Sequence, residues 1–568
     1  MKKYALLFLS LALCVLLLIP QKSAYSKKLS QADSGYVANQ ILIKFKDVFA
    51  QSVNDSVIPE QIFNNQRLRT ESLDVERQPR LGIVKVEFDD SLSIDEAIRQ
   101  AESDPRVEYA EPNFILKPSE TVPNDLRFNE MWGLFNQTVS GADISATRAW
   151  DLTTGSNNVV VGITDTGVDI QHPDLAGNIW TNVAEIPGNN LDDDNNGFVD
   201  DVNGWNFFDN NNRVFDSVTF DAHGTAVAGV IGAVGNNGAG ITGVSWNVKL
   251  MPLKFISNGS GDTAGAVKAI NYAIAQKNKG VNVRAINASW GPTGASCNDS
   301  FSKSLKKAIN KAGNAGIVFV SSAGNGDCGA NRNGDDLDAA PEYPASWGGS
   351  LPNALSVAAV DITDTFPTFS NFGHESVSVA APGVAVLTTV PRGFAGLPEA
   401  LAYSAQSGTS FSAPHVTGIV ALLATREPSL TPEQIKQRII TTAEPTLPLA
   451  SKIKSSGRAN AFNALMNHIP SVPSLGVGGV TLSGKFVFID GLGFVDSQTV
   501  IEVNGVQIGR SRFDSAFTLA NGSFTRIAVK LGKAGVAATF PVGTPVNITA
   551  FNPNTGARST AFSFTRRF

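Results

Sequence analysis

Ser410 is the residue of this chain whose surroundings fit best with a nucleophile. It opens an apolar helical stretch that follows the small residues 407–409. The unpaired N–H groups and the positive end of the dipole at a helix start favour negative charge on a reacting atom. Because a serine there is also a common N-cap, the nucleophile interpretation requires a base and a group that orients the base.

His223 and Asp165 are the candidates for those two partners. His223 opens a second helical stretch, residues 223–231, whose glycines and alanines allow close packing. Asp165 ends the β-branched run 158–164, which is typical of a buried parallel strand whose carboxyl end faces a site. Taken singly, Asp165 fits a cap at a strand end and His223 fits a buried structural histidine. Taken together with Ser410, they favour an Asp–His–Ser triad.

Three motifs in this order resemble the subtilisin-like serine peptidases. They are Asp165-Thr166-Gly167 with His172-Pro173-Asp174-Leu175 after it, His223-Gly224-Thr225, and residues 408–415 around Ser410. A fourth motif, residues 321–325, follows the apolar strand 317–320. By the resemblance, the Asn325 side-chain amide and the Ser410 backbone N–H form an oxyanion hole. The resemblance implies an α/β fold, a three-layer domain with a mainly parallel sheet, and peptide hydrolysis through an acyl-enzyme.

Other histidines are not expected to act as the base. His415 is five residues along the same helix as Ser410 and points elsewhere, while His172 lies on the loop beyond the strand end. His374 and His468 have no motif around them and are expected to face solvent.

Two short segments resemble the strands with which this family binds an extended peptide: Ser289, Trp290 and Gly291, and Ser322, Ala323 and Gly324. Their glycines predict a roomy pocket before the cut bond and hence cleavage after large, uncharged side chains. Residues 341–345 are expected to border the same pocket.

An acidic insertion predicts a structural calcium ion. Oxygen ligands alternate there, with a glycine at the sixth position, as in the first half of a calcium loop. Asn203 replaces the usual glutamate at position twelve, so we predict a shorter cage, against the alternative of a solvated acidic loop. The candidate ligands are Asp192, Asp194, Asn196, the Phe198 carbonyl and Asp200. We expect no organic cofactor.

The N-terminus predicts export. Residues 1–26 combine lysines, an apolar run of ordinary signal-peptide length and small residues before a cut after Ser26, whereas an uncleaved anchor would need a longer run. We therefore expect a secreted protein, with periplasmic retention as an alternative and no membrane association after signal removal.

Cys297 and Cys328 remain as an even pair after signal removal, which predicts a disulfide or, alternatively, two thiols. The net charge of −6 gives no indication of a nucleic-acid partner.

Three domains are predicted after the signal. Residues 35–117 form a small α+β unit, with strands at 40–46, 81–88 and 107–112 and a helix at 93–102, that resembles an inhibitory propeptide cut near 117–123; a plain accessory domain is the alternative. Residues 124–467 alternate strands and helices, as a parallel sheet requires. Residues 476–568 resemble an all-β immunoglobulin-like sandwich of the IPT/TIG type, whose partner the sequence does not indicate.

The predicted protein is thus a secreted, self-processing serine endopeptidase that acts on polypeptides and whose own propeptide is an intramolecular inhibitor. Two alternatives come from other classes. One is a silent binding protein of subtilisin fold, which complete motifs oppose, and the other is an adhesin whose proteolysis serves mainly its own maturation.

Overall fold

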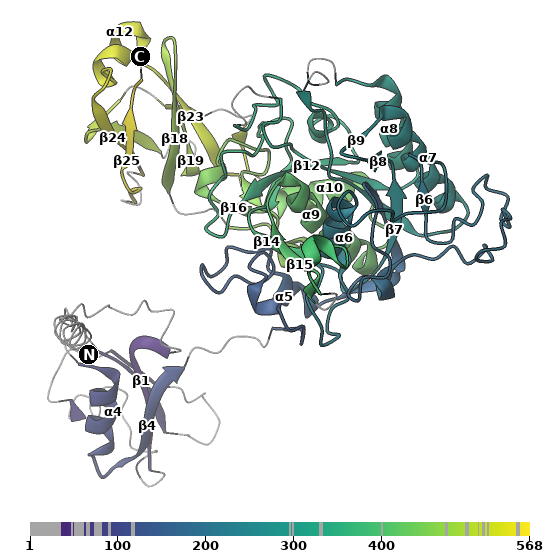
Figure 1. The fold of residues 1–568 in the computed structure, drawn as a ribbon. Helices are drawn as coiled ribbons and strands as arrows, with labels where there is room; N and C mark the ends of the chain where they lie inside the picture. Colours follow the sequence, from purple (N-terminus) through teal and green to yellow (C-terminus); the bar gives the residue numbers. More distant parts are fainter. Residues whose placement is uncertain are drawn as a thin grey trace, which may run out of the picture. The chain divides into compact units, whose positions relative to one another are not determined.

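The chain forms two compact units, Met1–Ser119 and Glu120–Phe568, in the computed structural model (Figure 1). The predicted signal, residues 1–26, lies outside the described residues, as do residues 117–119 of the predicted cut region. The structure describes residues 36–46, 49, 62–63, 69–72, 82–88, 92–114, 120–294, 297, 300–328, 333–398, 401–471, 475–494, 499–508, 511–513, 517–519, 522–552 and 557–567.

The described residues of the first unit include an antiparallel sheet of order β2-β3-β1-β4 and the helix α4. Its elements are β1 Tyr36–Phe45, β2 Arg69–Ser72, β3 Ile83–Glu87, α4 Ile94–Glu102 and β4 Val107–Phe114. α4 begins with a capping box in which Ser93 and Glu96 satisfy each other's backbone N–H groups. Alternate residues of β1, among them Ile41 and Ile43, are fully buried, so this small unit has a core of its own.

A nine-stranded sheet organises the second unit, in the order β16-β17-β13-β12-β11-β10-β5-β7-β6. All neighbouring pairs are parallel except β16 with β17. The strands are β5 Gly155–Asp165, β6 Trp205–Asn206, β7 Asn247–Lys254, β10 Val283–Ala288, β11 Val318–Ser322, β12 Ala354–Val360, β13 Val379–Pro382, β16 Glu444–Pro445 and β17 Gly457–Arg458. Two hairpins lie outside the sheet, β8 Ile256–Ser257 with β9 Ser260–Gly261 and β14 Val386–Thr389 with β15 Tyr403–Gln406.

Helices cover both faces of this sheet and confirm the predicted three layers. Side chains of α6 and α9 share one core with Val161 and Val320, whereas those of α7 and α8 share another with Val160 and Phe319. Successive strand residues point to opposite faces, so the two cores lie on opposite sides. The helices are α5 Ala146–Trp150, α6 Ala222–Gly232, α7 Thr263–Asn278, α8 Lys303–Asn314, α9 Thr409–Arg426, α10 Pro432–Thr441 and α11 Ala461–Met466.

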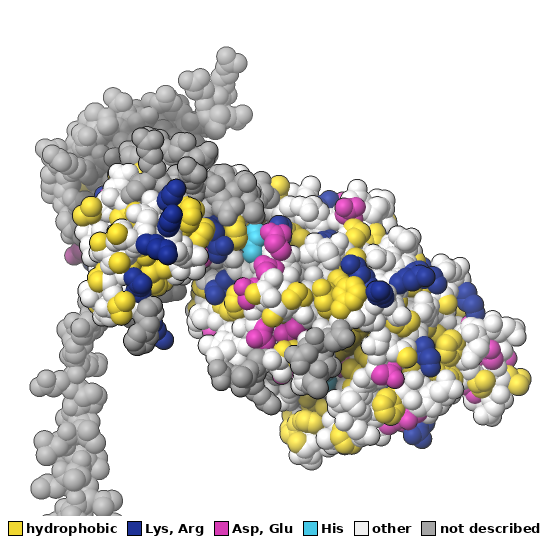
Figure 2. Space-filling model, turned by 90° about the horizontal axis from the view of Figure 1, so that it is seen from above, with side chains coloured by type: hydrophobic (Ala, Val, Ile, Leu, Met, Phe, Trp, Pro, Cys, Tyr) yellow, Lys and Arg dark blue, Asp and Glu magenta, His cyan; other side chains and the backbone are white. Residues whose placement is uncertain are grey.

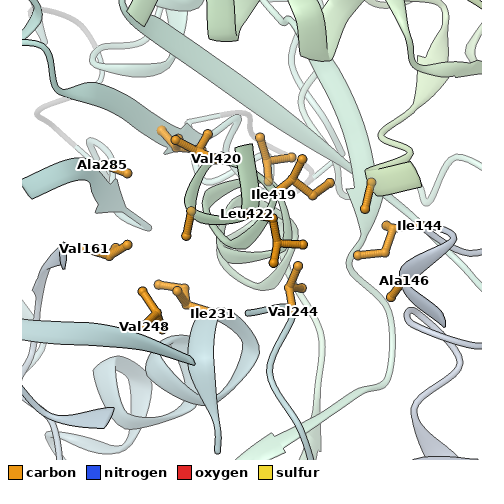
Figure 3. Packing of buried hydrophobic residues seen from close by; sticks show 14 of the residues in the cluster. Ile144, Ala146, Val161, Ile231, Val244, Val248, Ala285, Ile419, Val420 and Leu422 are labelled. Atoms are coloured by element: carbon orange, nitrogen blue, oxygen red, sulfur yellow. The ribbon is translucent and has the colours of Figure 1, made fainter. Parts of the chain in front are cut away.

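α9 is the central helix of the larger core. Its residues from Phe411 to Ala424 are buried on all sides, as expected for a helix that is apolar all round. Figure 3 shows Ile419, Val420 and Leu422 of α9 surrounded by side chains from the sheet and from neighbouring segments, including Val161 and Ala285. This packing fixes the position of the helix start relative to the strand ends.

The C-terminal part consists of two four-stranded antiparallel sheets, β18-β19-β23-β22 and β21-β20-β24-β25, around a shared apolar core. A short helix, α12 Gly532–Thr539, accompanies the predicted strands. The strands are β18 Gly476–Ser483, β19 Phe486–Phe494, β20 Val500–Val503, β21 Val506–Gln507, β22 Ser511–Phe513, β23 Phe524–Lys530, β24 Pro545–Phe551 and β25 Phe562–Thr565.

Two general properties complete the fold. No helix among the described residues is long and apolar enough to cross a membrane. On the face shown in Figure 2, acidic and basic side chains are interspersed with apolar ones.

Candidate active site

The carboxyl end of β5 and the start of α6 bring Asp165 and His223 together. His223 Nδ1 lies 2.8 Å from Asp165 Oδ1, and the backbone N–H of Thr166 donates to the same oxygen at 2.7 Å. Asp165 is 1% exposed, whereas the His223 side chain keeps 35% of its surface. The Asp165 carboxylate is therefore held in place and shielded from solvent. Asp165 holds Nδ1 of the His223 ring, and Nε2 points away from Asp165.

Gly224 makes this approach possible. A Cβ added at Gly224 would lie 2.3 Å from the carbonyl oxygen of Gly167 and 3.2 Å from Asp165 Cβ. Its backbone N–H donates to Thr166 Oγ1 at 3.0 Å, which ties the helix start to the strand end. The His-Gly pair in the sequence is thus a packing requirement of the site.

The charge of Asp165 controls protonation of His223. Burial alone would lower the pKa of His223, but the negative charge of Asp165 and the hydrogen bond to it outweigh burial. The pKa of His223 therefore lies above the ordinary value for an imidazole.

Ser410 lies in the first turn of α9, as predicted. The preceding Gly408 has φ 144°, a backbone conformation that favours glycine. Ser410 Oγ donates to the Ser289 carbonyl at 3.3 Å, and Ser289 Oγ donates to the Ser410 carbonyl at 2.8 Å. The ring of Phe411, the next residue, lies 5.7 Å from the His223 ring, so His223 lies close to the start of α9 that contains Ser410.

Thr409 holds the Asn325 amide beside Ser410. Asn325 Oδ1 accepts from the backbone N–H and from Oγ1 of Thr409, both at 2.9 Å. With the carbonyl side of the amide engaged, its Nδ2 side is the donor that remains for a substrate oxygen. Sequence reasoning missed these contacts of Thr409, although the residue stands directly before Ser410.

The two predicted substrate segments line one cavity of about 330 Å³ together with Ser410 and Asn325. They are Ser289, Trp290 and Gly291 after β10, and Ser322, Ala323 and Gly324 at the end of β11. A larger cavity of about 500 Å³ lies elsewhere, along α10, and none of the predicted site residues lines it. We therefore place the active site in the smaller cavity.

Comparison with known proteins decides the family. A family model described as the subtilase family matches residues 156–468, more than half of the chain. The chain belongs to the subtilase family. A second model, described as the fervidolysin N-terminal prodomain, matches residues 23–113.

Several curated proteins are similar to this subtilase. A thermophilic serine proteinase of Bacillus sp. (strain AK1) is 29% identical, over 78% of this chain and 91% of that protein. Thermitase of Thermoactinomyces vulgaris is 32% identical, over 57% of this chain and 93% of that protein. An extracellular protease of Xanthomonas campestris is 32% identical, over 65% of this chain and 61% of that protein.

The other histidines of this subtilase lie outside the cluster just described. His415 is 2% exposed, its Nδ1 lies 2.8 Å from the Phe411 carbonyl, and burial lowers its pKa to about 4. His172 is fully buried, with Nε2 3.0 Å from the Ala402 carbonyl. The expectation of solvent exposure holds for His468 and is wrong for His374, which is 7% exposed and packs against the Phe517 ring, with ring centroids 3.8 Å apart.

The acidic insertion places its oxygens differently from the predicted spacing. Three acids, Glu185, Asp194 and Asp201, offer carboxylate oxygens that all lie within 4.8 Å of one another. Of these, only Asp194 belongs to the predicted set. Asp192 accepts from the N–H groups of residues 196 and 197, and Asp200 accepts from those of residues 188–190.

The Glu185 cluster fits a divalent cation. The Asp194 side chain is 8% exposed, and its Oδ1 is buried without a hydrogen-bond partner. Burial raises the pKa of both Glu185 and Asp201, and neighbouring acids raise each further. Lys279 Nζ lies 3.1 Å from Asp194 Oδ2 and supplies part of the missing positive charge.

A second pair of acids was missed by sequence reasoning. Asp125 Oδ1 is buried without a partner, and burial together with the charge of Asp174 raises the pKa of Asp125 to about 6. Asp125 is far from Asp174 in the chain and has no recognisable motif, so only the fold reveals the pairing.

Proposed function

We propose that this chain is a serine endopeptidase that hydrolyses peptide bonds through an acyl-enzyme. The observation that carries the proposal is the arrangement of four groups. Asp165 and His223 form a hydrogen-bonded pair beside the Phe411 ring, and Ser410 at a helix start lines one cavity together with Asn325, which Thr409 holds. Each group alone has a structural explanation. Together they match the needs of acyl transfer.

In the first half of the reaction, Ser410 Oγ attacks the peptide carbonyl carbon and His223 Nε2 takes the hydroxyl proton. Asp165 stabilises the resulting imidazolium and keeps its Nδ1 side fixed. In the free enzyme Ser410 Oγ contacts the Ser289 carbonyl, so it turns toward His223 when substrate binds. The carbon–nitrogen bond then breaks, and His223 gives the proton to the leaving amine.

The tetrahedral intermediate carries its charge on the former carbonyl oxygen. Asn325 Nδ2 and the Ser410 backbone N–H donate to that oxygen, and the start of α9 favours its charge. In the second half, His223 takes a proton from water as the water oxygen attacks the acyl carbon. The ester bond breaks, the acid leaves, and the proton returns to Ser410 Oγ.

Casein digestion tests the proposal. Secreted wild-type protein should release soluble peptides, and Ser410→Ala should not, because the nucleophile is absent while the helix is kept. Thr425→Ala, on the same helix away from the cavity, is the matched control and should digest casein at the wild-type rate. Equal residual digestion by wild type and Ser410→Ala would contradict the triad.

The chain is made as a zymogen in this proposal. The match of residues 23–113 to a prodomain supports it, and the boundaries 35–117 for the propeptide and 124–467 for the catalytic domain are part of it. The propeptide would inhibit the enzyme until it is cut near 117–123. Ser410→Ala should therefore accumulate as uncut precursor, and active wild-type enzyme added in trans should cut it.

Export through a signal at residues 1–26 is also proposed. The sequence of the signal and the extracellular relative from Xanthomonas campestris support a secreted enzyme. N-terminal sequencing of the mature protein tests both cuts, since it would begin after the propeptide. A mature protein beginning at residue 27 would contradict the zymogen.

Structural calcium and the role of the last domain complete the proposal. We assign the calcium to the cluster of Glu185, Asp194 and Asp201, where the ion would neutralise buried carboxylates and anchor the insertion. The ion would take no part in the reaction.

We assign residues 476–568 to the IPT/TIG type on the strand pattern of two antiparallel sheets.

A further inference from the structure

The cavity beside Ser410 contains acidic groups for which the proposed chemistry has no use. Glu342 and Asp327 both line it, and they are the charged residues among the described residues of its wall. Asp327 is exposed, whereas Glu342 is 5% exposed. A pocket meant for uncharged side chains has no reason to bury a carboxyl group.

Glu342 lies directly beneath the substrate segment at the end of β11. Its Oε2 is 3.4 Å from the position that a Cβ on Gly324 would occupy, and it accepts from Asn371 Nδ2 at 3.2 Å. Asn371 in turn donates to the Ala323 carbonyl at 3.1 Å. The contact of Glu342 Oε2 with Asn371 and its close approach to Gly324 therefore fix the carboxyl group in the wall of the cavity.

The other oxygen of this carboxyl group lacks a partner. Glu342 Oε1 is buried with no hydrogen bond, and the same is true of Asp335 Oδ2. Burial raises the pKa of Glu342 to about 7, and the negative charges of Asp335 and Asp327 add to this effect. Glu342 is therefore partly protonated near neutral pH, and a positive charge in the cavity would favour its charged form.

We propose that this cavity selects substrates with lysine or arginine before the cut bond, whose charged end pairs with Glu342 while Asp327 attracts it from the surface. The proposal rests on the proposed function, because it concerns the same site, and it replaces the expectation of a preference for large, uncharged side chains. That expectation followed from the room left by Gly291 and Gly324, and room alone does not set charge.

The rest of the cavity suits the stem of such a side chain. Its wall includes the apolar surfaces of Trp290, Phe255 and Ala323. The Trp290 ring packs edge-on against Phe255, with ring centroids 5.1 Å apart. Lysine and arginine bury their methylene stems along such surfaces and keep the charged end on a polar partner.

The preference should depend on pH. Asp335 and Asp327 are the titratable groups that act on Glu342, and Asn371 is its polar neighbour. Glu342 is neutral below its pKa and charged above it, so preference for lysine over phenylalanine should rise as pH rises through about 7. Protonation of His223 affects both substrates equally and cancels in the ratio.

Peptide p-nitroanilides of the form succinyl-Ala-Ala-Pro-X test the proposal with mature enzyme. At pH 8.5, kcat/KM should be about 30-fold or more higher for lysine and arginine than for phenylalanine at X. Glu342→Gln should lower kcat/KM for lysine and arginine by a similar factor and change the phenylalanine value less than about threefold. Glu433→Gln, an exposed acid on α10 outside this cavity, is the matched control and should keep the wild-type ratio.

The outcomes separate this proposal from the proposed function. If wild type cleaves none of these substrates, the endopeptidase proposal fails. If it cleaves phenylalanine at least as well as lysine at both pH 6 and pH 8.5, only the acidic pocket is overturned. Should Glu342→Gln not mature, mass-spectrometric mapping of wild-type cuts in a denatured protein decides, since cuts without enrichment after lysine and arginine would overturn the pocket.

Discussion

His223 depends on Asp165 for both its orientation and its affinity for a proton. The hydrogen bond of 2.8 Å directs one ring nitrogen to the carboxylate, and the charge of the carboxylate stabilises the protonated ring. In the proposed mechanism, the interaction that prepares His223 to receive a proton from Ser410 therefore also makes the free enzyme's imidazole easier to protonate from solvent.

The dependence of activity on pH follows from this coupling. Only neutral His223 can accept the Ser410 proton, so kcat/KM should fall as pH drops through the pKa of His223. Because Asp165 raises that pKa, the midpoint should lie above 6.5, the ordinary value. Asp165→Asn should lower the midpoint and reduce kcat by about 10,000-fold. A wild-type midpoint below 6.5, in a profile with a fluorogenic peptide, would contradict the coupling.

At the scale of residues, the sequence predicted groups whose motifs are local and missed those made by distant contacts. Ser410, His223 and Asp165 each stand beside small or β-branched neighbours that reveal their place. Residues 341–345 were expected to border the pocket, and Glu342 and Ala345 line it. The charge environment of Glu342 was not predicted, because it depends on Asp335 and Asn371, which reach it only in the fold. The charge environment of a substrate pocket is therefore harder to predict from sequence than the residues of a catalytic motif.

At the scale of elements, close packing of α6 against the end of β5 is the feature on which the site depends. Strand and helix bounds follow hydrophobic patterns, and the observed β5, β11 and α9 lie within a few residues of their predicted positions. β2 and α12 were not predicted, because short elements have weak patterns. The distance between elements, however, depends on single small residues such as Gly224.

Gly224→Ala tests that packing. Alanine is a better helix former than glycine by about 1 kcal/mol, but its Cβ would lie 2.3 Å from a backbone oxygen that cannot move freely. The contact should outweigh the propensity, so we expect a lower melting temperature and at least about a 10-fold loss of kcat/KM. Gly535→Ala in α12, whose nearest contact would be 3.2 Å, is the control. Wild-type activity in Gly224→Ala would contradict the role of close packing.

At the scale of the whole molecule, two regions outside the cavity affect stability: the acidic insertion and the C-terminal sheets. The insertion concentrates buried carboxylates, which are costly without a cation. The C-terminal sheets contact the catalytic part at two places. Ser451 Oγ donates to the Thr525 carbonyl at 2.6 Å, and the Phe517 ring packs against His374.

The structure joins Cys297 to Cys328, with Cα atoms 5.5 Å apart, which confirms the predicted disulfide.

Calcium removal should destabilise the enzyme. A chelator should lower the melting temperature of wild type by several degrees, because a bound ligand stabilises the folded state in proportion to its affinity and concentration. In Asp194→Asn the chelator should have a smaller effect, measured by differential scanning calorimetry. An equal effect in both would exclude the Glu185 cluster and direct attention to Asp125 and Asp174.

Deletion of residues 472–568 should separate stability from chemistry. We expect casein hydrolysis to persist, because the triad, Asn325 and both substrate segments lie before the deleted part. The melting temperature should fall, since His374 and Ser451 lose partners. A matured deletion protein that binds casein but no longer cuts it would give the C-terminal sheets a direct part in catalysis.

The place of α9 in the chain has a consequence during synthesis. A polypeptide made from its N-terminus presents Asp165 and His223 well before it reaches Ser410, and α9 is also the helix on which the strands of the large core assemble. Products of interrupted translation that end before residue 409 therefore lack both the nucleophile and the helix that would arrange the other groups. By the proposed mechanism, copies that end before residue 409 cannot cut the proteins of the producing cell, whether or not the propeptide inhibits them.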